Sequence, residues 1–208
     1  MVSNVKGRPT YRQQQAAATR DRIAEAAREL FAERGYGATS IDAIAAAAGV
    51  AVRTVYTAFG TKREMLSYIC ERWLEKAEAR QRAEAVLADP DPAGRLQGAA
   101  AWLTHLYATD FAVVMIFEAA TDESAETRDL LRAKLAGRNE VMDAMIASLG
   151  DHLVAPVEQA QAVYRALAAP GVYRELVVET GWTPQAFEDW LLRTLRAHVL
   201  GPARRSGH

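Results

Sequence analysis

Cysteine is almost absent from this sequence: Cys70 is the single cysteine among 208 residues. A lone cysteine cannot form an intramolecular disulfide, which excludes a small disulfide-stabilised secreted fold and favours a reducing compartment. Glycine and proline are also few, at 13 and 7 residues, so a sheet-rich fold with many turns is disfavoured.

Long apolar runs are absent as well. No stretch without a charged residue reaches the ~20 residues that span a bilayer. The N-terminal segment contains no apolar block of the kind found in a secretory signal. We therefore expect a cytoplasmic protein with no membrane partner.

The residues that are present suit a globular chain with a basic N-terminal part. Apolar residues make up 50% and charged residues 25% of the chain, enough for a real hydrophobic core. Residues 1–80 carry 13 Lys and Arg against 9 Asp and Glu, whereas residues 81–208 carry 12 against 17. A basic part on an acidic body predicts contact between the basic part and a polyanion such as nucleic acid.

Hydrophobic spacing predicts helices along almost the whole chain. In residues 20–34 the apolar side chains Ile23, Ala27, Leu30 and Phe31 follow one helical face, with Thr19 as the expected N-cap. Further helices are predicted at residues 41–48, 52–58, 61–88, 93–108, 110–120, 123–149, 156–168, 171–180 and 184–200. The expected fold is therefore all-α.

Residues 39–59 predict a helix, a sharp turn and a second helix. Gly49 suits a left-handed turn position, and the small Ala45 and Ala48 allow the two helices to approach closely. The second helix would point Val55 and Phe59 into the core and present its other face outward. Such a helix fits the major groove of DNA.

These residues resemble the TetR family of transcriptional regulators. The similarity lies in six short motifs: Phe31 to Gly37, Thr39-Ser40, Ile44-Ala45, Ala48-Gly49-Val50, Thr54-Val55-Tyr56 and Phe59 to Lys62. The resemblance implies a flexible basic arm over residues 1–18 and a three-helix DNA-binding domain over residues 19–64. It also implies a larger ligand-binding and dimerisation domain over residues 65–208.

The resemblance assigns DNA contacts to particular positions. Phosphate contacts are implied at the start of the second helix, on the recognition helix and at the start of the fourth: Thr39 or Ser40, then Tyr56, then Lys62. The exposed side of the recognition helix is expected to carry Val52, Arg53, Thr54 and Thr57. Arg53 is the candidate for base reading, because a guanidinium can bind O6 and N7 of guanine together.

The chain departs from the family pattern in three places. Ala51 replaces a capping Ser or Thr, and Ala58 replaces a polar residue that can contact phosphate. Ala46 and Ala47 leave the supporting helix nearly uncharged. We therefore expect the basic arm to contribute more, with Gly7-Arg8-Pro9 entering a minor groove.

A small-molecule effector is implied for the second domain. The expected lining is apolar and rich in Met and aromatic residues: Trp102, His105, Leu106, Phe111, Met115, Phe117, Met142 and Met145. Such a lining suits a largely apolar ligand, with His105 or Tyr107 as a polar anchor. The alternative is that these residues simply pack the core.

The last helices are expected to form a homodimer interface. The apolar stripes on them comprise Leu176, Val177, Phe187, Trp190, Leu191 and Leu195. Two such helices from each subunit would make a four-helix interface. The alternative is internal packing within one chain.

Signals of catalysis are weak. The sequence has no phosphate-binding glycine loop, no zinc-binding His pair on a helix and no nucleophile elbow, and its four histidines are scattered. We expect no enzyme activity, metal or cofactor. The favoured function is a repressor released from a pseudo-palindromic operator, a double-stranded DNA site, by the effector. A helical interaction protein and an all-α enzyme remain as alternatives.

Overall fold

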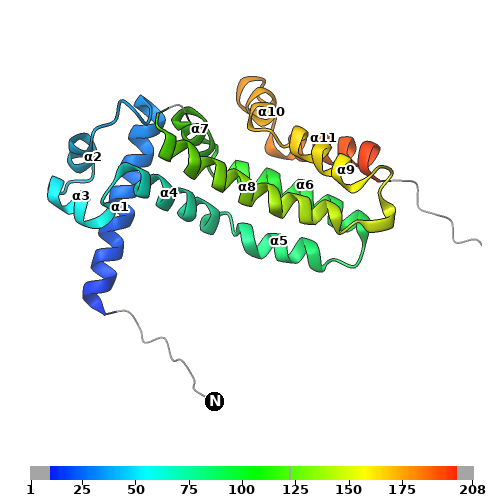
Figure 1. Ribbon diagram of the computed structural model, residues 1–208, viewed down its shortest axis with the longest axis horizontal. Helices are drawn as coiled ribbons and strands as arrows, with labels where there is room; N and C mark the ends of the chain where they lie inside the picture. Colours follow the sequence, from blue (N-terminus) through cyan, green and yellow to red (C-terminus); the bar gives the residue numbers. More distant parts are fainter. Residues whose placement is uncertain (1–9, 122, 201–208) are drawn as a thin grey trace, which may run out of the picture.

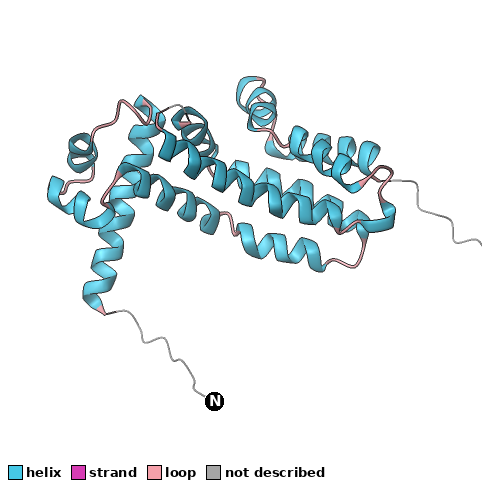
Figure 2. Ribbon diagram, viewed as in Figure 1, coloured by secondary structure: helices cyan, strands magenta, loops and turns pink. Residues whose placement is uncertain are grey.

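The computed structural model describes residues 10–121 and 123–200, and all regular elements in these ranges are helical (Figure 2). The helices are α1 (Tyr11–Arg34), α2 (Ile41–Ala47), α3 (Val52–Phe59), α4 (Lys62–Lys76), α5 (Ala79–Ala88), α6 (Pro92–Thr109), α7 (Phe111–Ala120), α8 (Ala125–Ala147), α9 (Val157–Leu167), α10 (Pro170–Tyr173) and α11 (Pro184–Val199). A 3-10 turn, η1 (Gly150–His152), and a π-helical segment, η2 (Arg174–Glu179), complete the set. The all-α expectation is confirmed.

The molecule is elongated, with α1, α2 and α3 at one end and α9 and α11 toward the other (Figure 1). Helix α4 leads from the first group into the second. In the C-terminal part, α6 packs against α5, α8 and α11, and α9 packs against α8 and α11.

Helix α1 begins earlier than its apolar pattern predicts. Thr10, not Thr19, is the N-cap, and it forms a reciprocal capping box with Gln13. Residues 11–18 are helical and exposed, so the predicted start at residue 20 is wrong. The expected groove-binding tripeptide Gly7-Arg8-Pro9 lies outside the described residues.

The predicted long fourth helix is interrupted. Glu78 adopts a left-handed conformation, with φ of +48°, between α4 and α5. Ala77 and Ala79 on either side of it are buried in the C-terminal core. The indole Nε1 of Trp102 donates a hydrogen bond of 2.8 Å to the Ala79 carbonyl, which holds α5 against α6. Packing against α6 therefore accounts for the break.

Two hydrophobic cores meet at α7. Val113, Ile116 and Ala120 of this helix are buried in the N-terminal core together with residues of α1 to α4. Val114, on the opposite side, is buried in the C-terminal core. The predicted domain boundary after residue 64 also falls inside one core, because Met65 of α4 is buried with the N-terminal helices.

Candidate nucleic-acid interface

Helices α2 and α3 form the predicted helix-turn-helix. The chain bends by 104° between them. Gly49 in the turn has φ of +62°, a conformation that favours glycine. Ala45 and Ala48 are buried at the crossing, and the Val50 amide donates to the Ala45 carbonyl at 3.0 Å. Small side chains and one glycine thus allow the steep approach.

Helix α3 has a buried side and an exposed side. Val55 and Phe59 are 1% and 3% exposed, so they fix the helix to the N-terminal core. Arg53, Tyr56 and Thr57 are exposed, and the side chain of Tyr56 retains 55% of its accessible surface. The structure therefore displays the side of α3 that the sequence predicts to face DNA.

Arg53 offers an unoccupied guanidinium on this side. Its side chain forms no hydrogen bond or ion pair with any described residue. Its backbone carbonyl accepts a 2.8 Å hydrogen bond from the Thr57 hydroxyl, which orients that side chain along the helix. The predicted neighbours Val52 and Thr54 are half-buried at the edges of the same surface.

The two residues before α2 have different roles. Ser40 is exposed, and its hydroxyl accepts a hydrogen bond of 3.1 Å from the Ala43 amide as the N-cap. Thr39 is only 2% exposed, and its hydroxyl donates to the carbonyls of Leu30 and Gly35. The predicted phosphate contact through the Thr39 side chain is contradicted, because that hydroxyl is buried and already bonded.

Lys62 is also directed inward. Its Nζ donates to the carbonyls of Tyr36 at 2.6 Å and Thr39 at 2.9 Å, and it lies 4.4 Å from the centre of the Tyr36 ring. Partial burial lowers the pKa of this ammonium. Lys62 thus ties α4 to the loop between α1 and α2, and its phosphate contact stays a prediction.

Arg20 is a supporting residue that sequence reasoning missed. Its guanidinium lies over the rings of Phe59 and Tyr68, at 4.8 and 4.4 Å from their centres. The Tyr68 hydroxyl in turn donates to the carboxylate of Asp21 at 2.6 Å. This cluster joins α1, α3 and α4. The pattern joins residues 47 positions apart, so local periodicity does not reveal it.

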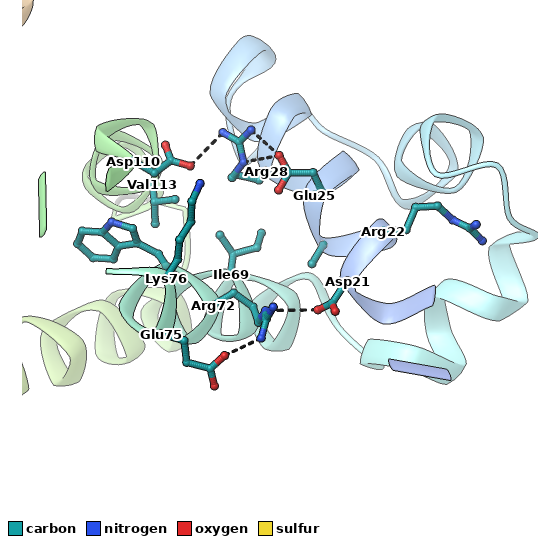
Figure 3. Close-up of a pocket in the computed structure, with 12 residues that line it drawn as sticks. Asp21, Arg22, Glu25, Arg28, Ile69, Arg72, Glu75, Lys76, Asp110 and Val113 are labelled. Atoms are coloured by element: carbon teal, nitrogen blue, oxygen red, sulfur yellow. Dashed lines mark hydrogen bonds and ion pairs between the residues drawn. The ribbon is translucent and has the colours of Figure 1, made fainter. Parts of the chain in front are cut away.

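A polar pocket lies where α1 and α4 meet the beginning of α7 (Figure 3). Its volume is about 750 Å³. Arg28 pairs across the pocket with Asp110 at 3.3 Å and along its own helix with Glu25 at 2.6 Å. Arg72 pairs with Asp21 at 3.4 Å. The Arg28–Asp110 pair thus joins α1 to the corner between α6 and α7, and the Arg72–Asp21 pair joins α4 to α1.

The structure disperses the predicted effector residues. Four of them pack in the C-terminal core: Trp102, Leu106, Met142 and Met145. Phe111 packs at the edge of this core, whereas Phe117 packs against the N-terminal one. Met115 is half-buried on α7. His105 is half-buried beside α5, where burial and Arg82 lower the pKa of the imidazole. Phe117 and His105 therefore lie in different surroundings. The prediction that all eight residues line one effector pocket is contradicted.

Three predicted dimer residues are internal. Phe187, Leu191 and Leu195 are each 0% exposed, because this side of α11 packs against α6 and α9 of the same chain. The alternative prediction, that this face of α11 packs within one chain, is therefore confirmed for these three residues. Leu176, Val177 and Trp190 are half-buried and retain accessible surface.

Two general features of the described part of the chain bear on function. Its His, Cys, Asp and Glu residues form no group of three or more that could hold a metal ion. Among the same residues, no single helix combines the length and apolarity needed to cross a membrane.

Comparison with known proteins supports the helix-turn-helix assignment. Residues 23–69 match the sequence profile of the tetR family of bacterial regulatory proteins. No curated protein matches the chain in a sequence search.

Solved structures share the fold over most of the chain. A transcriptional regulator from Aquifex aeolicus VF5 is 23% identical with a TM-score of 0.68, and the match covers 86% of this chain and 98% of the other. FadR from Bacillus subtilis, in complex with stearoyl-CoA, is 21% identical with a TM-score of 0.68, covering 84% and 96%. SmeT, in complex with triclosan, is 20% identical with a TM-score of 0.72, covering 89% and 93%.

Proposed function

We propose that the chain belongs to the tetR family of bacterial regulatory proteins, whose profile residues 23–69 match, and that it is a DNA-binding transcriptional repressor released from its operator by a small-molecule effector. One observation carries the proposal: α3 presents the unpaired guanidinium of Arg53 beside Tyr56 and Thr57, while Val55 and Phe59 anchor its other side. Members of this family are regulators, and the proposed activity is binding without catalysis.

The proposed DNA contacts follow from exposure. Arg53 binds a guanine edge in the major groove, and Thr57 lies one helical turn further along. Tyr56 and Ser40 donate their hydroxyls to phosphates on either side. Val52 and Thr54 make edge contacts. Lys62 and Thr39 support this surface from within, because their polar atoms are bonded inside the domain.

We propose that the protein acts as a homodimer. An eight-residue recognition helix makes few base contacts, and two related by a two-fold axis engage half-sites about 34 Å apart. Half-buried apolar residues that pack on the C-terminal core provide a surface for the partner: Val163, Leu167, Leu176, Val177, Trp190 and Leu192. The pseudo-palindromic operator follows from this symmetry.

Effector binding would reach α3 through α7. This helix contributes to both cores, and the Arg28–Asp110 ion pair joins its beginning to α1. The Trp73 indole also donates to the Leu106 carbonyl at 3.0 Å, which links α4 to α6. A displacement of α6 or α7 would therefore tilt α1 and α4 and change the spacing of two recognition helices. The energy available is the difference in effector affinity between the two states.

The fold relatives support a ligand-responsive regulator. FadR from Bacillus subtilis was solved with stearoyl-CoA and SmeT with triclosan. Both ligands have large apolar parts, which fits the predominantly apolar C-terminal core of this chain. We propose the cytoplasm as the site of action, because a bacterial operator lies there.

The decisive experiment is selection of bound duplexes from a random DNA pool, followed by fluorescence anisotropy and sedimentation. We expect a pseudo-palindromic consensus, one dimer per site and affinity that falls steeply with salt. A Val177→Asp variant should be monomeric and helical, with weakened operator binding, whereas Leu191→Asp should unfold. Enrichment of no sequence, or tight binding by a monomer, would contradict the proposal.

A further inference from the structure

A half-buried arginine at the edge of the C-terminal core, Arg138, forms no ion pair with any described carboxylate. Arg138 of α8 donates from Nη1 to the Tyr107 hydroxyl at 2.7 Å and from Nη2 to the amide oxygen of Asn139 at 3.2 Å. Its Nε is buried and has no hydrogen-bond partner among the described residues. Buried charges are normally paired, because removal from water is costly. Among residues 10–121 and 123–200, no carboxylate pairs with Arg138.

Tyr107 does not supply that anion. Its hydroxyl is fully buried and donates to the Ala168 carbonyl at 2.7 Å. Burial raises the pKa of Tyr107 to about 12, so the phenol is neutral at physiological pH. The nearby Glu118 carboxylate is directed to Arg174, at 4.0 Å. Arg138 thus faces a neutral hydroxyl.

An aromatic wall adjoins this hydroxyl. The Tyr107 ring lies 5.5 Å from Phe111 and 5.1 Å from Tyr173, measured between ring centres. Phe111 and Tyr173 are 4.8 Å apart, and Tyr173 continues to Phe187 at 4.9 Å. Planar or aliphatic groups pack well against such rings. A charged hydrogen-bond donor and an apolar wall therefore occur side by side.

The segment over this wall has an unusual backbone. Tyr173 ends α10, and the next six residues, Arg174–Glu179, form the π-helical segment η2. π-helical turns are rare and frequently occur at functional sites. The exposed Arg174–Glu118 ion pair across the edge contributes little stability. Displacement of this segment offers a route to the aromatic wall.

We propose that Arg138, Tyr107, Phe111 and Tyr173, hereafter the Arg138 site, bind an effector that carries one carboxylate on an apolar body. The carboxylate pairs with the guanidinium, and the body packs on the rings. One unpaired positive charge matches a monoanion better than the two charges of a phosphate monoester. This inference rests on the proposed function and specifies the chemistry of its effector.

The experiment compares matched acids and amides with the full-length protein in the absence of DNA. The probes are phenylacetate against phenylacetamide and octanoate against octanamide, followed by calorimetry and thermal unfolding. We expect an acid to bind and raise Tm while its amide does not. The two pairs distinguish an aromatic body from an aliphatic one.

Variants assign the binding to the site. Arg138→Gln should weaken the acid roughly ten- to a hundredfold, since a charged hydrogen bond is lost. Arg95→Gln is the matched control: its Nε is also buried without a described partner, but it lies about 18 Å from Tyr107 along α6. Tyr107→Phe, which removes the hydroxyl bonded to the guanidinium, should weaken the acid to a smaller extent.

Three results would overturn the inference: no acid binds at millimolar concentration, the amides bind equally well, or folded Arg138→Gln retains full affinity. If Arg138→Gln fails to fold, the acid–amide comparison on the natural sequence and the Tyr107→Phe variant decide the matter. Operator binding is measured separately. Acid binding without operator binding would contradict the proposed function alone, and the reverse would contradict this site alone.

Discussion

Arg53 and Lys62, both basic residues of the helix-turn-helix region, have different surroundings. Arg53 is exposed and has no partner among the described residues, whereas the Lys62 ammonium is bonded to two backbone carbonyls at 2.6 and 2.9 Å. A charge held inside the domain is less available to phosphate than one displayed to solvent. Replacing Arg53 should therefore affect DNA binding, whereas replacing Lys62 should affect the stability of the domain.

Replacement of Arg53 should relax sequence choice. Arg53→Ala is expected to lose about 1–3 kcal/mol of discrimination at one base pair, with unchanged Tm, because the side chain contributes to no described internal contact. Anisotropy titrations with the selected operator and single-base variants measure this. The control is Arg80→Ala, an exposed arginine of α5 paired with Glu84. Equal loss in both variants would contradict base reading by Arg53.

Replacement of Lys62 should destabilise the N-terminal domain. Lys62→Met is expected to lower the free energy of unfolding by about 1–3 kcal/mol, because charge-assisted bonds to the Tyr36 and Thr39 carbonyls disappear. Urea titration measures the change, with the exposed neighbour Arg63→Met as the control. An unchanged stability with a flatter salt dependence of DNA binding would instead assign Lys62 to phosphate.

Cys70 should make stability fall at high pH. Burial raises the pKa of this thiol from 9.0 to about 11. Between these values the unfolded chain releases a proton that the native chain retains, so ionisation favours unfolding. The expected loss reaches about 2–3 kcal/mol from pH 9 to 11. Urea unfolding of the natural protein and of Cys70→Ala at each pH isolates the effect of the thiol. If the free energy of unfolding falls equally with pH in both proteins, the thiol is solvated and the prediction is wrong.

At the scale of elements, α3 starts without a side-chain cap. Ala51 occupies the N-cap position in the extended conformation that a capping residue adopts, with φ −70° and ψ 147°. Its methyl group cannot accept a hydrogen bond from the first turn. The departure noted in the sequence is therefore a real deficiency in the structure.

Restoring the cap should stabilise the recognition helix. Ala51→Ser is expected to raise the free energy of unfolding by about 0.5–2 kcal/mol, or Tm by roughly 2–4 °C per kcal/mol. Ala47→Ser is the control, because Ala47 is exposed at the C-terminal end of α2, where a serine hydroxyl cannot cap the first-turn amides. Thermal unfolding followed by circular dichroism compares the two. A Tm no higher than that of the control would refute the capping argument.

The elements that sequence reasoning located best depend on local signals. Gly49 and the small Ala45 and Ala48 mark the turn between α2 and α3, and Thr61 caps the start of α4 as predicted. The early start of α1 was missed because residues 11–18 are exposed and carry no apolar stripe. The break at Glu78 was missed because it contains neither glycine nor proline and follows from packing of α5 on α6.

Hydrophobic periodicity shows which side of a helix is buried, but it does not show which element packs against that side. Phe187, Leu191 and Leu195 form the predicted face of α11, but spacing alone does not distinguish α6 of the same chain from a second subunit. The contact between Arg138 and Tyr107 could not be predicted from the sequence. Arg138 lies in a polar stretch of α8 with no apolar pattern, and only the tertiary fold brings it to Tyr107.

At the scale of the whole molecule, the N-terminal helices should not fold alone. A fragment of residues 1–90 lacks Val113 and Ile116, whose burial contributes about 3–6 kcal/mol. This is comparable to the total stability of a small domain, about 5–15 kcal/mol. We expect low helicity and no cooperative unfolding for the fragment, with the full chain as reference. A cooperative transition in the fragment would contradict the shared core.

Helix α7 therefore restricts how such a regulator can be recombined. A hybrid made by joining α1 to α4 to the sensing half of another regulator would expose an apolar surface on α1 unless the donor helix matched Val113, Ile116 and Ala120. Grafting these three side chains onto the donor helix should restore a functional hybrid. The fit of α7 against the N-terminal core thus limits which effector-binding domains can be joined to this DNA-binding domain.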